Sequence, residues 1–227
     1  MASDLFTVKS TIHGDDMNTA MIKRLGLGLG IAGMGCLTVA SQAVEPLSPV
    51  QAYAASYKLE AKGQLDSALN VLADQLAHNP ADEYVLLRAG WLNYRLGHFQ
   101  ASEVDYRNSL TLNPQSLDAR MGVTLPLMAE GRWRESLLYA QQVQQMAPGN
   151  YDASIRVLLC EQMLKNWSGL RAQAINMTHE FPAESDPWLY LARAASALGD
   201  NKASRKAYGQ VLFRVPEQAE AVHALLP

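Results

Sequence analysis

Apolar residues recur at helical spacing along this chain, in short blocks that are broken by glycine or proline. In the stretch LNYRLGHFQAS, residues 92–102, Leu92 and Leu96 lie on one helical face and Phe99 continues the apolar pattern. Gly97 interrupts the pattern, although a glycine inside a helix costs about 1 kcal/mol relative to alanine. The pattern therefore predicts two helices joined by a turn at Gly97.

These breaks fall on a regular 34-residue grid. Glycines occupy one position of the grid and prolines another, at Gly63, Gly97, Gly131 and Gly199 and at Pro80, Pro114, Pro148, Pro182 and Pro216. Pro80 follows Gly63 by half a period, which is room for one helix, and an equal stretch follows each proline. Such a period indicates repeated helical hairpins that are stabilised by stacking on their neighbours.

The grid also predicts where helices turn and end. Glycine permits the sharp turn inside each hairpin. Proline disfavours a helical conformation in the preceding residue, so the second helices should end at Asn79, Asn113, Ala147, Phe181 and Val215. In repeat four Lys165 holds the glycine position, beside Asn166, which tolerates the left-handed conformation. Pro126 falls inside a first helix and is expected to kink it.

The remaining positions describe how two helices approach. Small residues recur five positions after the glycine column and should let the helices pack closely: Ala68, Ser102, Ser136 and Ser204, with Gly90 in a facing helix. Large apolar residues fill two further columns: Leu65, Phe99, Trp133 and Trp167, and Leu72, Tyr106 and Tyr208.

Together these features resemble the tetratricopeptide repeat (TPR), most closely in AGWLNYRLGHFQASEVDYRNSLTLNP, residues 89–114. The resemblance implies an all-α fold, a right-handed superhelical solenoid of five hairpins. Its repeats would cover residues 49–82, 83–116, 117–150, 151–184 and 185–216.

A short capping helix is expected over residues 217–227 because terminal caps keep such solenoids soluble. Val222, Leu225 and Leu226 share one helical face that would cover repeat five. Glu217, Gln218 and Glu220 would then be left toward solvent.

Residues 1–43 have the layout of a secretory signal peptide. Lys23 and Arg24 precede an uncharged stretch, and small residues stand at the positions that a signal peptidase reads. Cleavage after Ala43 would give a periplasmic protein in which residues 44–48 form a short linker. Since residues 1–16 hold three aspartates, the true start is expected at Met17 or Met21. The alternative is a lipoprotein anchored to the membrane at Cys36.

Composition and motifs argue against catalytic and nucleic-acid-binding classes. The net charge is −3 with no basic stripe, so no nucleic-acid partner is expected. The five histidines are scattered without metal-ligand spacing, and Cys160 is the only cysteine beyond the signal segment. Residues 28–33 match G-x-G-x-x-G but lack the flanking strand and helix, so no cofactor is expected. We therefore expect no enzyme.

The resemblance further implies that the first helices line a concave groove. Its lining residues would be Tyr53, Tyr57, Tyr84, Leu87, Arg88, Trp91, Tyr94, Arg95, Met121, Leu125, Met128, Arg156 and Met163. Tyr, Trp and Arg are common interface anchors, and methionine adapts to differing partners. Packing between repeats remains an alternative for the aliphatic members, whereas Arg88, Trp91, Tyr94 and Arg95 are predicted to be surface anchors.

The sequence thus predicts a non-catalytic scaffold of the bacterial envelope that binds a partner peptide or helix. By resemblance, pilus, secretion or exopolysaccharide-export assemblies are candidate settings. A periplasmic chaperone that shields apolar segments of exported subunits is the alternative. Tyr53 and Tyr57 stand where related domains that clamp a carboxylate have Lys and Asn, so such a clamp is not expected.

Overall fold

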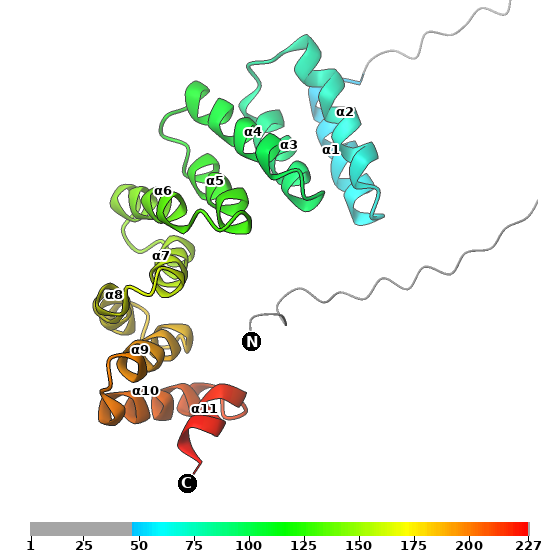
Figure 1. The fold of residues 1–227 in the computed structure, drawn as a ribbon. Helices are drawn as coiled ribbons and strands as arrows, with labels where there is room; N and C mark the ends of the chain where they lie inside the picture. The colour runs from blue at the N-terminus through cyan, green and yellow to red at the C-terminus, as the bar shows by residue number, and fades with distance from the viewer. Residues whose placement is uncertain (1–46, 227) are drawn as a thin grey trace, which may run out of the picture. The chain divides into compact units, whose positions relative to one another are not determined.

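The computed structural model describes residues 47–226, in which all the regular secondary structure is α-helical (Figure 1). The predicted signal segment, its cleavage site at Ala43 and Cys36 lie outside the described residues. The helices are α1 (Pro49–Ala61), α2 (Leu65–His78), α3 (Glu83–Arg95), α4 (Phe99–Leu112), α5 (Leu117–Ala129), α6 (Trp133–Met146), α7 (Tyr151–Met163), α8 (Trp167–Glu180), α9 (Asp186–Ala197), α10 (Asn201–Arg214) and α11 (Ala219–Leu225).

Each helix packs chiefly against its neighbours in the chain, and first helices also contact across repeats, as α3 does with α5 and α7 with α9. Figure 1 shows the hairpins following one another in chain order from α1 to α11. This nearest-neighbour packing is that of a solenoid, and it confirms the predicted all-α fold of five hairpins.

Turns and helix ends follow the predicted grid. Gly63, Gly97, Gly131 and Gly199 all have positive φ, between 74° and 80°. The second helices end at the predicted residues, because the capping positions are Asn79, Asn113, Ala147, Phe181 and Val215. Helix-capping residues form a further regular column, which was not predicted from the sequence. Side chains just before the first helices accept backbone N–H bonds at Ser48, Asp82, Ser116, Asn150 and Gln218.

Lys165 itself takes the left-handed conformation in repeat four, with φ at 57°. Asn166 does not share it. Its φ is −80° and its side chain accepts a hydrogen bond from the Gly169 N–H at the start of α8. The hairpin geometry therefore imposes the left-handed conformation on the residue in the glycine column, whatever the type of that residue.

Replacing Lys165 by glycine is expected to raise the free energy of unfolding by about 1 kcal/mol, because a side chain in this conformation costs roughly that amount. Lys62 is the matched control, since it is also exposed at the end of a first helix but has φ at −92°. Lys62→Gly should lower stability by about 0.5 kcal/mol. Urea denaturation of both variants measures the two changes in the free energy of unfolding. Equal effects would mean that Lys165 carries no strain.

The interior is built mainly from leucine, valine and alanine, with small residues where neighbouring helices approach closely. Ala68, Ser102 and Ser136 are fully buried, as their column predicted. The Tyr106 ring fills the space beside two glycines, Gly90 and Gly122, where no β-carbon stands. Helix α5 runs through the buried Pro126 without ending there.

The capping helix α11 is shorter than predicted, and it packs through a different face. Ala221 is buried and Leu225 packs beside it, whereas Val222 and Leu226 are exposed. Glu220 does not point to solvent as predicted, because it accepts hydrogen bonds from Arg193 and Tyr208. The reason is register: α11 continues the 34-residue grid as a first helix. From repeat two onward the third position of the repeat is buried, at Val85, Ala119, Ala153 and Pro187. Ala221 is the corresponding residue of α11 and is buried as well.

Candidate binding surface

An exposed apolar surface lies where α1 and α3 begin. Val50 is 80% exposed and Tyr84 is 71% exposed. With Tyr53 and Ala54 they line a cavity of about 330 Å³, whose wall is completed by Pro49, Asp82 and Val85. We call Val50, Tyr53, Ala54 and Tyr84 the N-terminal patch.

Local sequence holds this patch in place. Ser48 and Gln51 form a capping box that sets the start of α1, with Pro49 in its first turn. Residues 50, 53, 54 and 57 then share one face at helical spacing. The rings of Tyr53 and Tyr57 meet edge to face at 5.2 Å. Burial, together with the neighbouring Tyr57 hydroxyl, raises the pKa of Tyr53 to about 12, so the phenol stays neutral.

Three of the predicted anchors converge instead on one carboxylate of repeat one, Glu60. Arg88 forms an ion pair with Glu60 at 2.5 Å, and Trp91 donates its indole N–H to Glu60 at 2.8 Å. Arg95 approaches the same carboxylate at 3.1 Å. Burial alone would raise the pKa of Glu60, but these hydrogen bonds and positive charges outweigh it and hold the pKa below its usual value.

The prediction that Arg88 is a surface anchor is wrong, because only 4% of this residue is exposed. Its guanidinium donates to Ser56 at 3.0 Å and lies over the Tyr57 ring, 3.7 Å from the centroid. Arg88 therefore joins repeat two to repeat one. Its partners belong to the preceding repeat, which a reading of one helix face could not reveal.

Trp91 and Tyr94 are half-buried and pack against each other, with ring centroids 5.9 Å apart. Tyr94 also packs against Phe99 of the same hairpin, at 6.0 Å. Of the four predicted anchors, only Arg95 is largely exposed, at 45%. These side chains lie close together, but they are engaged with the protein itself.

Arg156 repeats the arrangement of Arg88 two repeats later. It donates to the Met121 carbonyl and to the Thr124 hydroxyl, and Thr124 stands two full periods after Ser56. Met128 holds the position that corresponds to Glu60, so the carboxylate is missing here. Burial lowers the pKa of Arg156. The signal available in the sequence was this double period, Ser56 with Arg88 and Thr124 with Arg156.

The methionine end of the predicted groove is less open than the aromatic end. Leu87 is half-buried and packs against the buried Tyr106, Val123 and Leu127. Met121, Leu125 and Met128 are also half-buried. Met163 is exposed and borders a cavity of about 490 Å³ together with Trp167 and Arg193. The aromatic end therefore offers the more accessible apolar surface.

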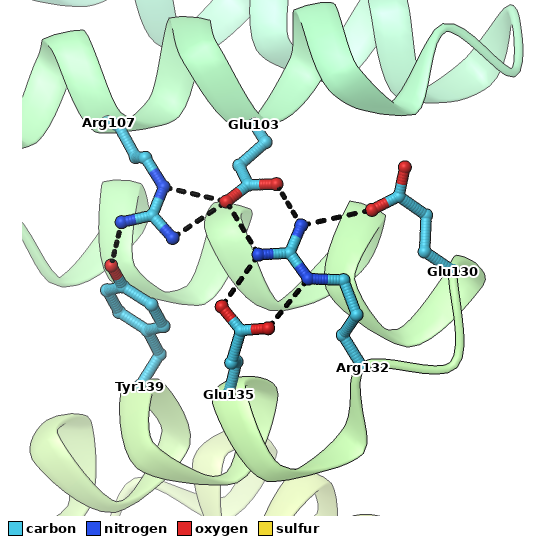
Figure 2. Close-up of polar contacts among 6 residues, drawn as sticks. All are labelled: Glu103, Arg107, Glu130, Arg132, Glu135 and Tyr139. Atoms are coloured by element: carbon cyan, nitrogen blue, oxygen red, sulfur yellow. Dashed lines mark hydrogen bonds and ion pairs between the residues drawn. The ribbon is translucent and has the colours of Figure 1, made fainter.

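An ion-pair network joins repeats two and three. Figure 2 shows Arg132 between the carboxylates of Glu103, Glu130 and Glu135, with Arg107 bridging Glu103 and Tyr139. Arg132 lies 2.5 Å from Glu103, and Arg107 lies 2.7 Å from it. Burial would raise the pKa of Glu103, but its hydrogen bonds to both arginines lower it. Because every charged group in it has a partner within the network and Arg132 joins Glu103 across the repeats, we assign this network to inter-repeat packing.

Residues 47–226 hold no grouping of His, Cys, Asp and Glu that could bind a metal ion. Cys160 is buried beside Ser136, and burial raises the pKa of its thiol, the opposite of what an active thiolate needs. Over the same range, every helix is too short or too polar to span a bilayer.

No protein-family model and no curated protein matches this sequence. Solved structures do. MamA superposes with a TM-score of 0.67 at 14% identity, over 73% of this chain and 96% of its own. A tetratricopeptide repeat protein from Parabacteroides merdae superposes with a TM-score of 0.70 at 16% identity, over 77% of this chain and 70% of its own. YrrB, a TPR protein with an unusual peptide-binding site, superposes with a TM-score of 0.67 at 13% identity, over 78% of this chain and 91% of its own.

This chain has the tetratricopeptide-repeat fold. The TPR hairpins supply a row of first helices, from α1 to α9, and the N-terminal patch lies on the first two of them. The most exposed apolar side chains of that row are Val50 and Tyr84.

Proposed function

We propose that this protein is a non-catalytic scaffold of the bacterial envelope that binds a segment of a partner protein at its N-terminal patch. The observation that carries the proposal is the pair of exposed side chains, Val50 and Tyr84, beside a cavity of about 330 Å³. An apolar hollow with a few polar groups at its rim is typical of a binding site.

The chemistry of the patch favours an apolar anchor on the partner. Tyrosine contributes a large and fairly rigid contact area, and Tyr53 is held by Tyr57. Asp82 lies at the rim, where its carboxylate also accepts the backbone N–H of Val85. A leucine or phenylalanine of the partner would enter the cavity and bury the exposed apolar surface.

Support for a peptide partner also comes from the fold, since YrrB, a structural neighbour, is described as having a peptide-binding site. The envelope location rests on the signal-peptide layout of residues 1–43. Pilus, secretion and exopolysaccharide-export assemblies are the settings that we propose for this scaffold.

Tyr84→Ala is expected to weaken binding of the natural partner about thirtyfold, which corresponds to about 2 kcal/mol. Because Tyr84 is mostly exposed, the free energy of unfolding should change by less than about 0.5 kcal/mol. The partner is first isolated with the intact protein from its own cells, and affinity is then measured by calorimetry. Phe213→Ala is the matched control, since Phe213 is 81% exposed but lies on α10.

Equal affinity of the two variants would refute the patch as the binding surface. Weak binding to many unfolded proteins, without a preferred partner, would instead favour the chaperone function. Melting temperatures of both variants establish that any loss of affinity is not a loss of folding.

A further inference from the structure

One position of the repeat changes chemistry along the row of first helices. The second position of the five repeats is occupied in turn by Val50, Tyr84, Asp118, Asp152 and Asp186. All five residues are exposed. The position is therefore apolar at the N-terminal patch and acidic in the three repeats that follow.

Contacts show that these residues occupy equivalent places. Pro49 and Tyr84 line the same cavity, so the second position of repeat two lies beside the first position of repeat one. Tyr151 donates its hydroxyl to Asp186 at 3.2 Å, which is the same relation between repeats four and five. The acidic residues thus continue the line that begins at the patch.

None of the three aspartates has a salt-bridge partner among the described residues. Nearby cations are engaged elsewhere: Arg156 contacts Met121 and Thr124, and Arg120 contacts Gln142 and Ser116. An acidic residue in the first turn suits the helix dipole. That effect also applies to the first-turn residues Asp66, Glu83 and Glu135. What distinguishes Asp118, Asp152 and Asp186 is that they share the repeat position of Val50 and Tyr84.

We infer that the bound segment is an extended chain with an apolar anchor at the N-terminal patch and basic side chains beyond it. This inference rests on the proposed function and adds the chemistry of the partner. Among the first helices that carry these aspartates, α7 and α9 pack against each other. Packed helices are about 8–10 Å apart, and an extended chain advances about 3.3 Å per residue. Lysine or arginine at about every third residue would therefore meet Asp118, Asp152 and Asp186 in turn.

Three synthetic peptides test the inference on the full chain. All begin with the same Leu-Phe anchor; the first then has lysine at every third position, the second has glutamate at those positions, and the third has the same lysines clustered at its far end. Exposed ion pairs contribute about twofold in affinity each, so the first peptide should bind about tenfold tighter than the second at low salt. Added salt should narrow the difference because it screens exposed charges.

Replacing the three aspartates together, D118N, D152N and D186N, should remove the preference for spaced lysines. The matched control is D66N, D74N and E217Q, which changes the net charge equally at exposed positions elsewhere. Equal losses in the two triple variants, or equal binding of spaced and clustered lysines, would overturn the inference in favour of general charge attraction.

The peptides also separate this inference from the proposed function. If all three bind equally and Tyr84→Ala weakens each of them, the patch binds an apolar anchor and the basic partner is wrong. If none of the three binds, the proposed function and the inference both fail for this surface.

Discussion

Arg88→Met is expected to lower the free energy of unfolding by about 3 kcal/mol. Arg88 is nearly inaccessible, and its removal leaves Glu60, itself mostly buried, without its closest cation. Breaking a buried ion pair from one side is costly because the remaining charge stays desolvated. Contacts with Ser56 and the Tyr57 ring are lost as well. Urea denaturation followed by circular dichroism measures the change.

Arg95→Met is the matched control, because Arg95 contacts the same Glu60 carboxylate but is 45% exposed. An exposed pair contributes about 0–1 kcal/mol, so this variant should remain close to the parent. Adding Glu60→Leu to Arg88→Met should recover part of the loss, since no buried charge is then left unpaired and Arg95, which loses its partner, is exposed. Similar losses for Arg88→Met and Arg95→Met would mean that burial does not determine the strength of this contact.

The contrast between these two arginines shows what the sequence could predict. The 34-residue period determined the turns and helix ends, because glycine and proline act through their own backbone geometry. The exposure of a side chain on a first helix depends on the neighbouring repeat. Arg88 and Arg95 both belong to the predicted groove and both contact Glu60, but only Arg88 is also enclosed by Ser56 and the Tyr57 ring of the preceding repeat.

The same limit explains the capping helix and the patch. Helix α11 was assigned a face from its apolar residues alone, but from repeat two onward the solenoid buries the third position of the repeat, which in α11 is Ala221. The N-terminal patch was predicted in part, through Tyr53 and Tyr84. Val50 stands beside them at the cavity, on the first turn of α1, and was not among the predicted lining residues.

Gly122→Ala should lower the free energy of unfolding by about 2 kcal/mol, because inserting atoms into a packed interior is costly even where alanine is the better helix former. A β-carbon on Gly122 would lie 2.2 Å from the Tyr106 ring, closer than any real contact. Tyr106 is buried, so the ring cannot move aside without disturbing its neighbours. Thermal and urea denaturation both report the loss.

Gly209 provides the control, because it also lies inside a helix, α10, but a β-carbon there meets nothing within 4 Å. Gly209→Ala should therefore raise stability by about 0.5–1 kcal/mol. Combining Gly122→Ala with Tyr106→Leu tests the cause, since the smaller side chain leaves room for the new methyl group. The double variant should then lose less stability than the sum of the losses in the two single variants, as expected for residues in contact. Strict additivity would mean that Gly122 is required for some reason other than the Tyr106 ring, and the close packing of repeats two and three would need another explanation.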